Sequence, residues 1–131
     1  MKCDRIAPLG LIPVVLAALM FCSSAWAGEA DVVDVRVQTQ ADGSYRFDAT
    51  VRHADEGWDH YADAFEIVGP DGEVLGTRVL AHPHVNEQPF TRSLGGVKIP
   101  PGIATVKVRA RDKVHGLGGE IYQVTLPGRG K

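Results

Sequence analysis

Sulfur is scarce in this sequence and is confined to its first 22 residues. The chain has two cysteines, Cys3 and Cys22, and two methionines, Met1 and Met20. Residues 28–131 therefore can form no disulfide bond and offer no thiolate or thioether to a metal ion. This composition excludes a disulfide-stapled scaffold, and it excludes copper(I) and blue-copper sites that depend on Cys or Met.

An excess of one charge sign and a long apolar run are also lacking. The 131 residues carry 14 Lys or Arg and 16 Asp or Glu, a formal net charge of −2, with no basic block. Nucleic acid and anionic membrane surfaces are therefore not expected as partners. The apolar run from Leu9 to Cys22 is interrupted by Pro13. It falls short of the roughly 20 residues that span a bilayer, so we expect no membrane span after processing.

The first 27 residues have the order of a secretory signal peptide. Lys2 and Arg5 precede the apolar run, and Ala25 and Ala27 place small residues at the two positions that a signal peptidase reads. Cleavage after Ala27 is predicted. Anchoring through Cys22 is less favoured, because a lipid-attachment site needs a small residue where Phe21 stands.

Removal of residues 1–27 from the 131 leaves 104 residues, which is enough for one domain with its own core. It also removes two basic residues and one acidic residue, so the formal net charge changes from −2 to −3. The predicted organisation is a signal peptide at 1–27 and a single β-sandwich domain at 28–131. The predicted location is the periplasm or the extracellular space.

Apolar and polar residues alternate along most of residues 28–131, with the period of half-buried strands. Turn residues such as Ala41–Ser44 and Gly69–Gly72 separate the alternating stretches. The pattern predicts strands at 31–39, 45–53, 61–68, 73–81, 90–94, 104–112 and 120–126, and the fifth can continue to 99 after a bulge at Gly95–Gly96. No helical periodicity of useful length and no internal repeat occur.

Seven short strands with regular turn signals predict an all-β, seven-strand antiparallel sandwich. In strand count and spacing the chain resembles immunoglobulin-like and fibronectin type III-like domains. The segments HYAD, GPDG, HPHVNEQPFTRS and VHG also resemble motifs of small secreted bacterial proteins of unassigned function. The resemblance implies an immunoglobulin-like architecture and no particular activity.

Histidines are expected at one end of this sandwich. In an antiparallel meander successive connections alternate between the two ends, and tight turns (ADGS, GPDG, IPPG) occupy one end. The longer polar loops at the other end carry His60, His82, His84 and His115, and His53 approaches the same end. Loops held at one end of a rigid scaffold often bind ligands.

Clustered imidazoles predict a metal site. His82, His84, His115 and His60 are the expected ligands, and zinc or copper(II) is the expected ion, because the donors are nitrogen without sulfur. Asp59, Asp63, Asp112 and Glu87 are candidates for a carboxylate ligand or a supporting partner. His53 is left out of the predicted site, because it ends an apolar strand face and is interpreted as a rim residue packing on Tyr45 or Trp58.

Two other functions remain open at this point. The histidine-rich end could contact another protein, such as an envelope protein, without any metal, as an interaction or accessory domain. A metal-dependent redox or hydrolytic enzyme is a third interpretation. No nucleophile elbow is recognisable near Ser93 or Thr91, so no catalytic residue is predicted and a non-enzymatic role in metal handling or sensing is preferred.

Overall fold

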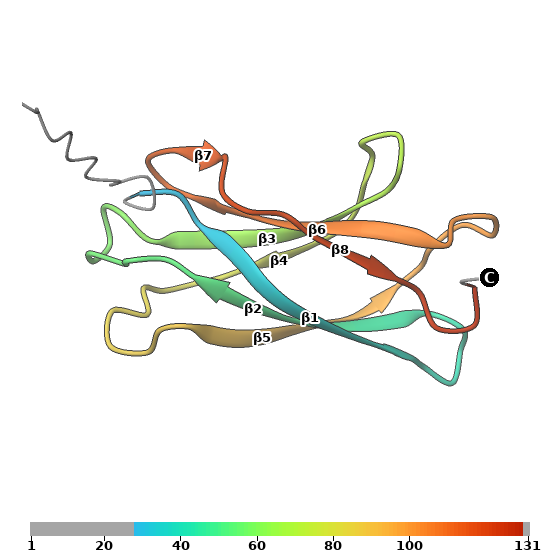
Figure 1. Cartoon of the computed structure of the whole chain (residues 1–131). Helices are drawn as coiled ribbons and strands as arrows, with labels where there is room; N and C mark the ends of the chain where they lie inside the picture. The colour runs from blue at the N-terminus through green and yellow to red at the C-terminus, as the bar shows by residue number, and fades with distance from the viewer. Residues whose placement is uncertain (1–27, 130–131) are drawn as a thin grey trace, which may run out of the picture.

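The computed structural model of this protein describes residues 28–129, and the predicted signal peptide lies outside these residues. Eight β-strands follow one another along the described chain (Figure 1). They are β1 (Asp31–Thr39), β2 (Tyr45–Arg52), β3 (Ala62–Val68), β4 (Val74–Val79), β5 (Phe90–Val97), β6 (Thr105–Asp112), β7 (Gly116–Leu117) and β8 (Tyr122–Thr125). Among residues 28–129 we find no helix long and apolar enough to cross a membrane.

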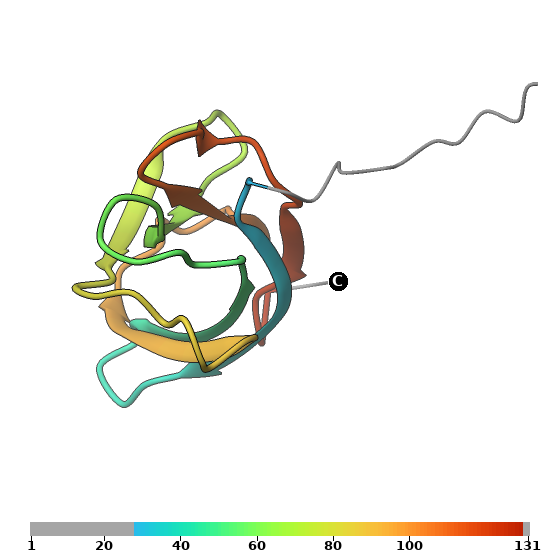
Figure 2. The same ribbon diagram turned by 90° about the vertical axis from the view of Figure 1, so that its left-hand side faces the viewer.

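The strands form two antiparallel sheets that face each other. One sheet has the order β1-β2-β5, and the other has the order β4-β3-β6-β7, with β8 also paired to β6. The view along the strands shows the two layers closing around a common interior (Figure 2). The predicted all-β antiparallel sandwich is confirmed.

Most strands lie within two residues of their predicted bounds. β5 runs through the predicted bulge to Val97, and the register opposite β2 shifts between Tyr45 and Phe47. Gly96 takes a φ of 67° there, which a glycine adopts at little cost. The two-residue strand β7 was not predicted, because its pairing of Leu117 with Arg111 follows from the course of the loop and not from alternation.

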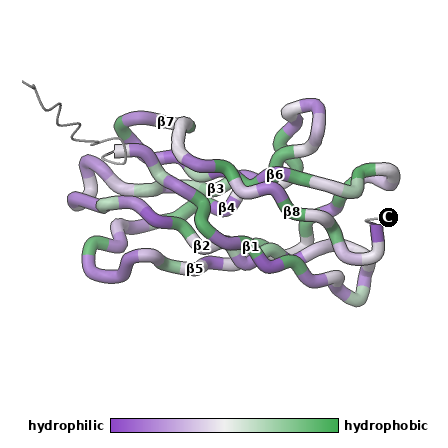
Figure 3. Tube along the Cα trace, viewed as in Figure 1, coloured by the Kyte–Doolittle hydropathy of each residue, from purple (hydrophilic) through white to green (hydrophobic). Residues whose placement is uncertain are grey.

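Inward-facing residues of both sheets build the core. Phe47, Phe65 and Phe90 are fully buried, and Ile67, Val51, Val106, Val108 and Leu126 fill the space between them. Figure 3 shows hydrophobic and hydrophilic residues alternating along the strands, as expected where one face of each sheet is buried. Burying a side chain of this size contributes about 1.5–3 kcal/mol.

The two ends of the sandwich differ as the sequence predicts. The β1–β2, β3–β4 and β5–β6 turns lie at one end, and the β2–β3, β4–β5 and β6–β7 loops lie at the other (Figure 1). Gly28 also lies at the second end, because its carbonyl oxygen lies 3.1 Å from Nε2 of His53. We call this second end the histidine pole, since His53, His60, His82, His84 and His115 all belong to its loops.

Candidate metal centre

His53 enters the interior because it continues the inward face of β2. Phe47, Ala49 and Val51 are completely buried, and His53, two residues further, is 3% exposed. Its Nδ1 atom lies against Oδ1 of Asp55, and its Nε2 atom lies 3.1 Å from the carbonyl oxygen of Gly28. His53 therefore does not pack on the rim as the sequence suggested, but belongs to a buried polar cluster.

Asp112 reaches the same cluster from the opposite sheet. It continues the inward face of β6 after Val106, Val108 and Ala110, and its side chain is 0% exposed. Its Oδ1 atom accepts the backbone N–H groups of Val114 and His115 at 2.8 and 2.6 Å. Its Oδ2 atom is buried and has no hydrogen-bond partner. A buried carboxylate oxygen without a donor is costly and rare, and this atom faces His53.

His60 completes the cluster from the β2–β3 loop. Its Nδ1 atom lies 2.9 Å from Oε1 of Glu56, and its Nε2 atom lies 3.3 Å from the carbonyl oxygen of Gly28. The Glu56 carboxylate raises the pKa of His60 above its ordinary value, with the Gly28 carbonyl and Asp112 acting in the same direction against partial burial. His60 thus faces acceptors on both ring nitrogens.

These three side chains have the spacing of metal ligands. One possible ligand atom from each of His53, His60 and Asp112 lies within 4.8 Å of the others. The Nε2 atom of His53 is 3.6 Å from Oδ2 of Asp112, and the Nε2 atom of His60 is 3.5 Å from Oδ1 of the same residue. Zinc bonds of about 2.0–2.2 Å in a tetrahedron place neighbouring ligand atoms about 3.4 Å apart. We call His53, His60 and Asp112 the buried centre.

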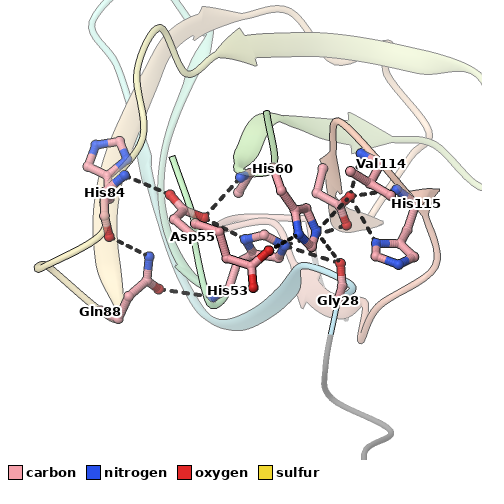
Figure 4. Close-up of polar contacts among 11 residues, drawn as sticks. Gly28, His53, Asp55, His60, His84, Gln88, Val114 and His115 are labelled. Carbon is pink, nitrogen blue, oxygen red and sulfur yellow. Dashed lines mark hydrogen bonds and ion pairs between the residues drawn. The ribbon is translucent and has the colours of Figure 1, made fainter. Parts of the chain in front are cut away.

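Each imidazole of the buried centre is oriented by a carboxylate behind it. Asp55 is fully buried behind His53 (Figure 4). The more exposed Glu56 lies 2.9 Å from Nδ1 of His60. A carboxylate at Nδ1 favours a proton on that atom, so an ion that displaces the Nε2 proton facing the Gly28 carbonyl oxygen would bind the lone pair there. Carboxylate–histidine–metal relays of this type are common around protein-bound metals.

His115 lies beside the buried centre. Its ring centroid is 5.1 Å from that of His60, and its Nδ1 atom is 3.2 Å from Oδ1 of Asp112. It also packs on Gly28, where an added Cβ atom would come within 2.5 Å of Cε1 of His115. The predicted pairing of His60 with His115 at one end therefore matches their positions.

His82 and His84 form a second pair. Their ring centroids are 4.7 Å apart, and the ring of His84 stacks on Phe90 at 4.0 Å. Figure 4 shows His84 on the other side of Asp55 from His60 and His115. Within residues 28–129 the one group with ligand spacing is the buried centre, which includes neither His82 nor His84. Metal binding by His60, His82, His84 and His115 together stays a prediction. The separation of His82 and His84 from the buried centre does not support it.

The ring of His84 is buried and unpaired. The residue is 6% exposed, and neither ring nitrogen has a hydrogen-bond partner. Burial lowers the pKa of His84, and the nearby Arg92 acts in the same direction. Its ring therefore stays neutral at neutral pH.

Two members of the buried centre carry a signal that the sequence contained. His53 and Asp112 each stand two residues beyond a buried Val or Ala, in phase with the apolar face of their strands. A polar residue in phase with a buried face is expected to be buried and to need a partner. Asp112 was among the four carboxylates considered from the sequence. Asp55 stands two residues beyond His53 and continues the same alternation of buried positions, but it was not considered from the sequence.

A protein of known sequence from another organism resembles this chain. The chain is 41% identical over 96 residues to a protein of Halomicrobium mukohataei named "Putative lipoprotein". The match covers 73% of this chain and 47% of that protein, so the chain spans about half the length of the curated relative it matches. No protein-family model matches the chain. No solved structure matches it either.

Proposed function

We propose that this protein binds one divalent transition metal ion, zinc or copper(II), at the buried centre, and that it serves in metal handling or sensing. The observation that supports this best is the geometry of His53, His60 and Asp112. Three ligand atoms lie within 4.8 Å, and both imidazoles have a carboxylate at Nδ1. Such an arrangement prepares two Nε2 lone pairs and one carboxylate oxygen for the same ion.

A cation would also remove an electrostatic cost. Asp112 is buried without a hydrogen bond to Oδ2, and Asp55 is buried directly behind His53. Buried charges are normally paired or bound to a metal, because desolvation disfavours an isolated one. A bound dication would satisfy Asp112 directly.

The choice of zinc or copper(II) follows from the donor atoms. Two imidazole nitrogens and a carboxylate oxygen, with no sulfur in residues 28–131, suit these ions better than copper(I). The three ligands leave at least one coordination position for a further group.

An envelope location is part of this proposal. The first 27 residues have the order of a signal peptide, and the relative from Halomicrobium mukohataei carries the name of a lipoprotein. Metal handling outside the cytoplasm fits a domain that offers nitrogen and oxygen donors and no thiol to oxidise.

Protein interaction at the histidine pole is the second candidate. A groove of about 540 Å³ lies between the β2–β3 and β4–β5 loops, lined by Trp58, His82, Pro83, Val85 and Glu87 among others. Trp58 is 63% exposed and Val85 is 52% exposed. Exposed aromatic residues are common at binding surfaces. A partner at this groove would contact His82 and leave the buried centre untouched.

Calorimetric titration with zinc and with copper(II) at neutral pH tests the metal proposal. We expect one ion per chain, and we expect His60→Ala to weaken binding by about 100-fold. His82→Ala is the matched control, since it removes the same side chain from the same pole but outside the buried centre, and it should bind like the unaltered protein. Failure of both ions to bind would overturn the proposal, as would equal losses in the two variants.

A further inference from the structure

Gly28 places its backbone inside the buried centre. Its carbonyl oxygen lies 3.1 Å from Nε2 of His53 and 3.3 Å from Nε2 of His60 (Figure 4). These are the two nitrogen atoms that also face Asp112. The spacing is close to the separation of about 3.4 Å expected between neighbouring ligands of a tetrahedral ion. The Gly28 oxygen is therefore positioned as a fourth ligand atom.

Gly28 is buried and packs directly on His115. A Cβ atom at residue 28 would lie 2.5 Å from Cε1 and 2.8 Å from Nε2 of His115, so a side chain there would displace the imidazole ring. Glycine allows the backbone to lie against His115 in its observed position.

The predicted processing point falls immediately before this residue. Hydrolysis of the Ala27–Gly28 peptide bond by a signal peptidase adds one water molecule, leaves the new carboxyl group on Ala27 and leaves an α-amino group on Gly28. The lone pair of an amide nitrogen is delocalised into the carbonyl group, so this nitrogen is a poor metal ligand. An α-amino group has a pKa of about 7.7–8.0, so a metal ion can displace its proton near neutral pH and bind the nitrogen. Processing therefore changes a poor ligand atom into a good one.

We propose that the mature amino terminus is itself a metal ligand: the α-amino nitrogen and carbonyl oxygen of Gly28 chelate the ion held by His53, His60 and Asp112. Nitrogen and oxygen of one residue close a five-membered ring with a metal, so both can bind at once. The donor set then comprises three nitrogen atoms and two oxygen atoms, which suits copper(II) and zinc. This inference rests on the proposed metal binding, and it makes full affinity dependent on removal of residues 1–27.

Mass spectrometry and zinc titration test the inference together. The full chain, exported by a host cell with its own signal, is purified and weighed, and a mature product that begins at Gly28 is expected. A product that begins at Cys22 or elsewhere would overturn the inference. A variant with one serine inserted between Ala27 and Gly28 moves the amine by one residue, and it should bind zinc at least about tenfold more weakly. A serine added after Lys131 is the matched control.

Chemical protection provides a second measurement on the unaltered mature protein. Brief acetylation at neutral pH, read by peptide mass spectrometry, should modify the Gly28 amine at least about fivefold more slowly when zinc is bound, because a coordinated amine has no free lone pair. Exposed Lys98 should react equally in both states. Unchanged reactivity of Gly28, or equal zinc affinity of the serine-extended variant, would overturn the ligand role of the amine and leave the proposed metal site intact. Absence of zinc and copper(II) binding in every form would instead overturn the proposed function.

Discussion

The carboxylate of Asp55 accepts the backbone N–H of His84 at 2.7 Å, although the two residues belong to different loops. Its other oxygen accepts the backbone N–H of Ala62 and lies against Nδ1 of His53. One buried side chain therefore connects the β4–β5 loop to the first residues of β3 and orients His53, a ligand proposed from the structure. Hydrogen bonds of Asp55 thus connect the backbone of His84 to the buried centre, and Gln88 makes a second connection between the backbones of His53 and His84.

Replacement of Asp55 by asparagine should affect both metal affinity and stability. The asparagine side chain would place an NH₂ group where one of the two accepting oxygens stands, so a backbone N–H or His53 would face a donor. We expect about 1–3 kcal/mol of lost stability and a loss of about 10–100-fold in zinc affinity. Denaturant unfolding and calorimetry measure these changes. Asp71→Asn, in the exposed β3–β4 turn, is the control and should change neither quantity.

Substitutions of Asp112 should separate its structural and metal-binding roles. Asp112→Asn retains an oxygen for the N–H groups of Val114 and His115 and replaces only the unpartnered Oδ2. Zinc affinity should fall by about 100-fold, whereas metal-free stability should change by less than about 1 kcal/mol. Asp112→Ala should lose both the affinity and about 1–3 kcal/mol of stability. If the asparagine variant binds zinc normally, Asp112 is not a ligand.

The raised pKa of His60 predicts a pH effect on metal binding. Because Glu56 favours the protonated ring, a zinc ion must displace a proton that the folded protein holds more tightly than the unfolded chain does. Zinc affinity should therefore begin to fall at a pH above the ordinary histidine value of about 6.5. Glu56→Gln should lower the pKa of His60, which ¹H NMR titration of the metal-free protein measures directly. An unchanged pKa would remove Glu56 as its main cause.

The raised pKa of His60 also determines how folding stability changes with pH. A group with a raised folded-state pKa contributes stability that is complete below its unfolded value and is lost as the pH rises through the folded value. Without metal, the stability difference between the unaltered protein and Glu56→Gln should thus be largest below about pH 6.5 and should disappear at higher pH. Urea unfolding at pH values of about 5.5, 6.5 and 8, which bracket the ordinary histidine value, provides this comparison.

The pH dependence of stability that His84 contributes should be opposite in sign to that of His60. Burial lowers its pKa, so the unfolded chain binds the proton more tightly, and stability is lost as the pH falls below about 6.5. His84→Phe removes two buried nitrogen atoms without partners and keeps a ring against Phe90. At neutral pH the free energy of unfolding of the variant should equal that of the unaltered protein or exceed it by about 1 kcal/mol. As the pH falls toward about 5, the variant should lose less stability than the unaltered protein does. His82→Phe, at an exposed position, should leave the acid dependence unchanged. A strong destabilisation by His84→Phe at neutral pH would mean that these nitrogens are bonded.

Periodicity was sufficient to predict the fold because strands such as β2 and β6 bury one face and expose the other. Val35 and Val37 in β1, and Val106 and Val108 in β6, place the strands before any contact is known, although a register shift at Val33 turns Val32 inward. Alternation of the connections then predicted that the histidines belong to one pole. Neither argument depends on the conformation of an individual loop.

The buried centre could be predicted only in part. Its location at the histidine pole and the inclusion of His60 and Asp112 follow from topology and residue type. Exclusion of His53 resulted from interpreting a polar residue on an apolar face as a rim residue, whereas a partner from the facing sheet permits its burial. The separation of His82 and His84 depends on how the β4–β5 loop packs against Asp55 and Phe90, and no periodic pattern encodes that packing.

The position of Arg129, the last described residue, determines which end of the chain is better for immobilising the protein on a surface. The guanidinium group of Arg129 donates to the carbonyl oxygens of Ile99, Pro100 and Ile103, at the pole of tight turns. Gly28 lies at the opposite pole, against the imidazoles. A fusion partner or surface linkage at the carboxyl end would leave the cluster facing the solution, whereas the same attachment at the amino end would place bulk at the entrance to the ligands.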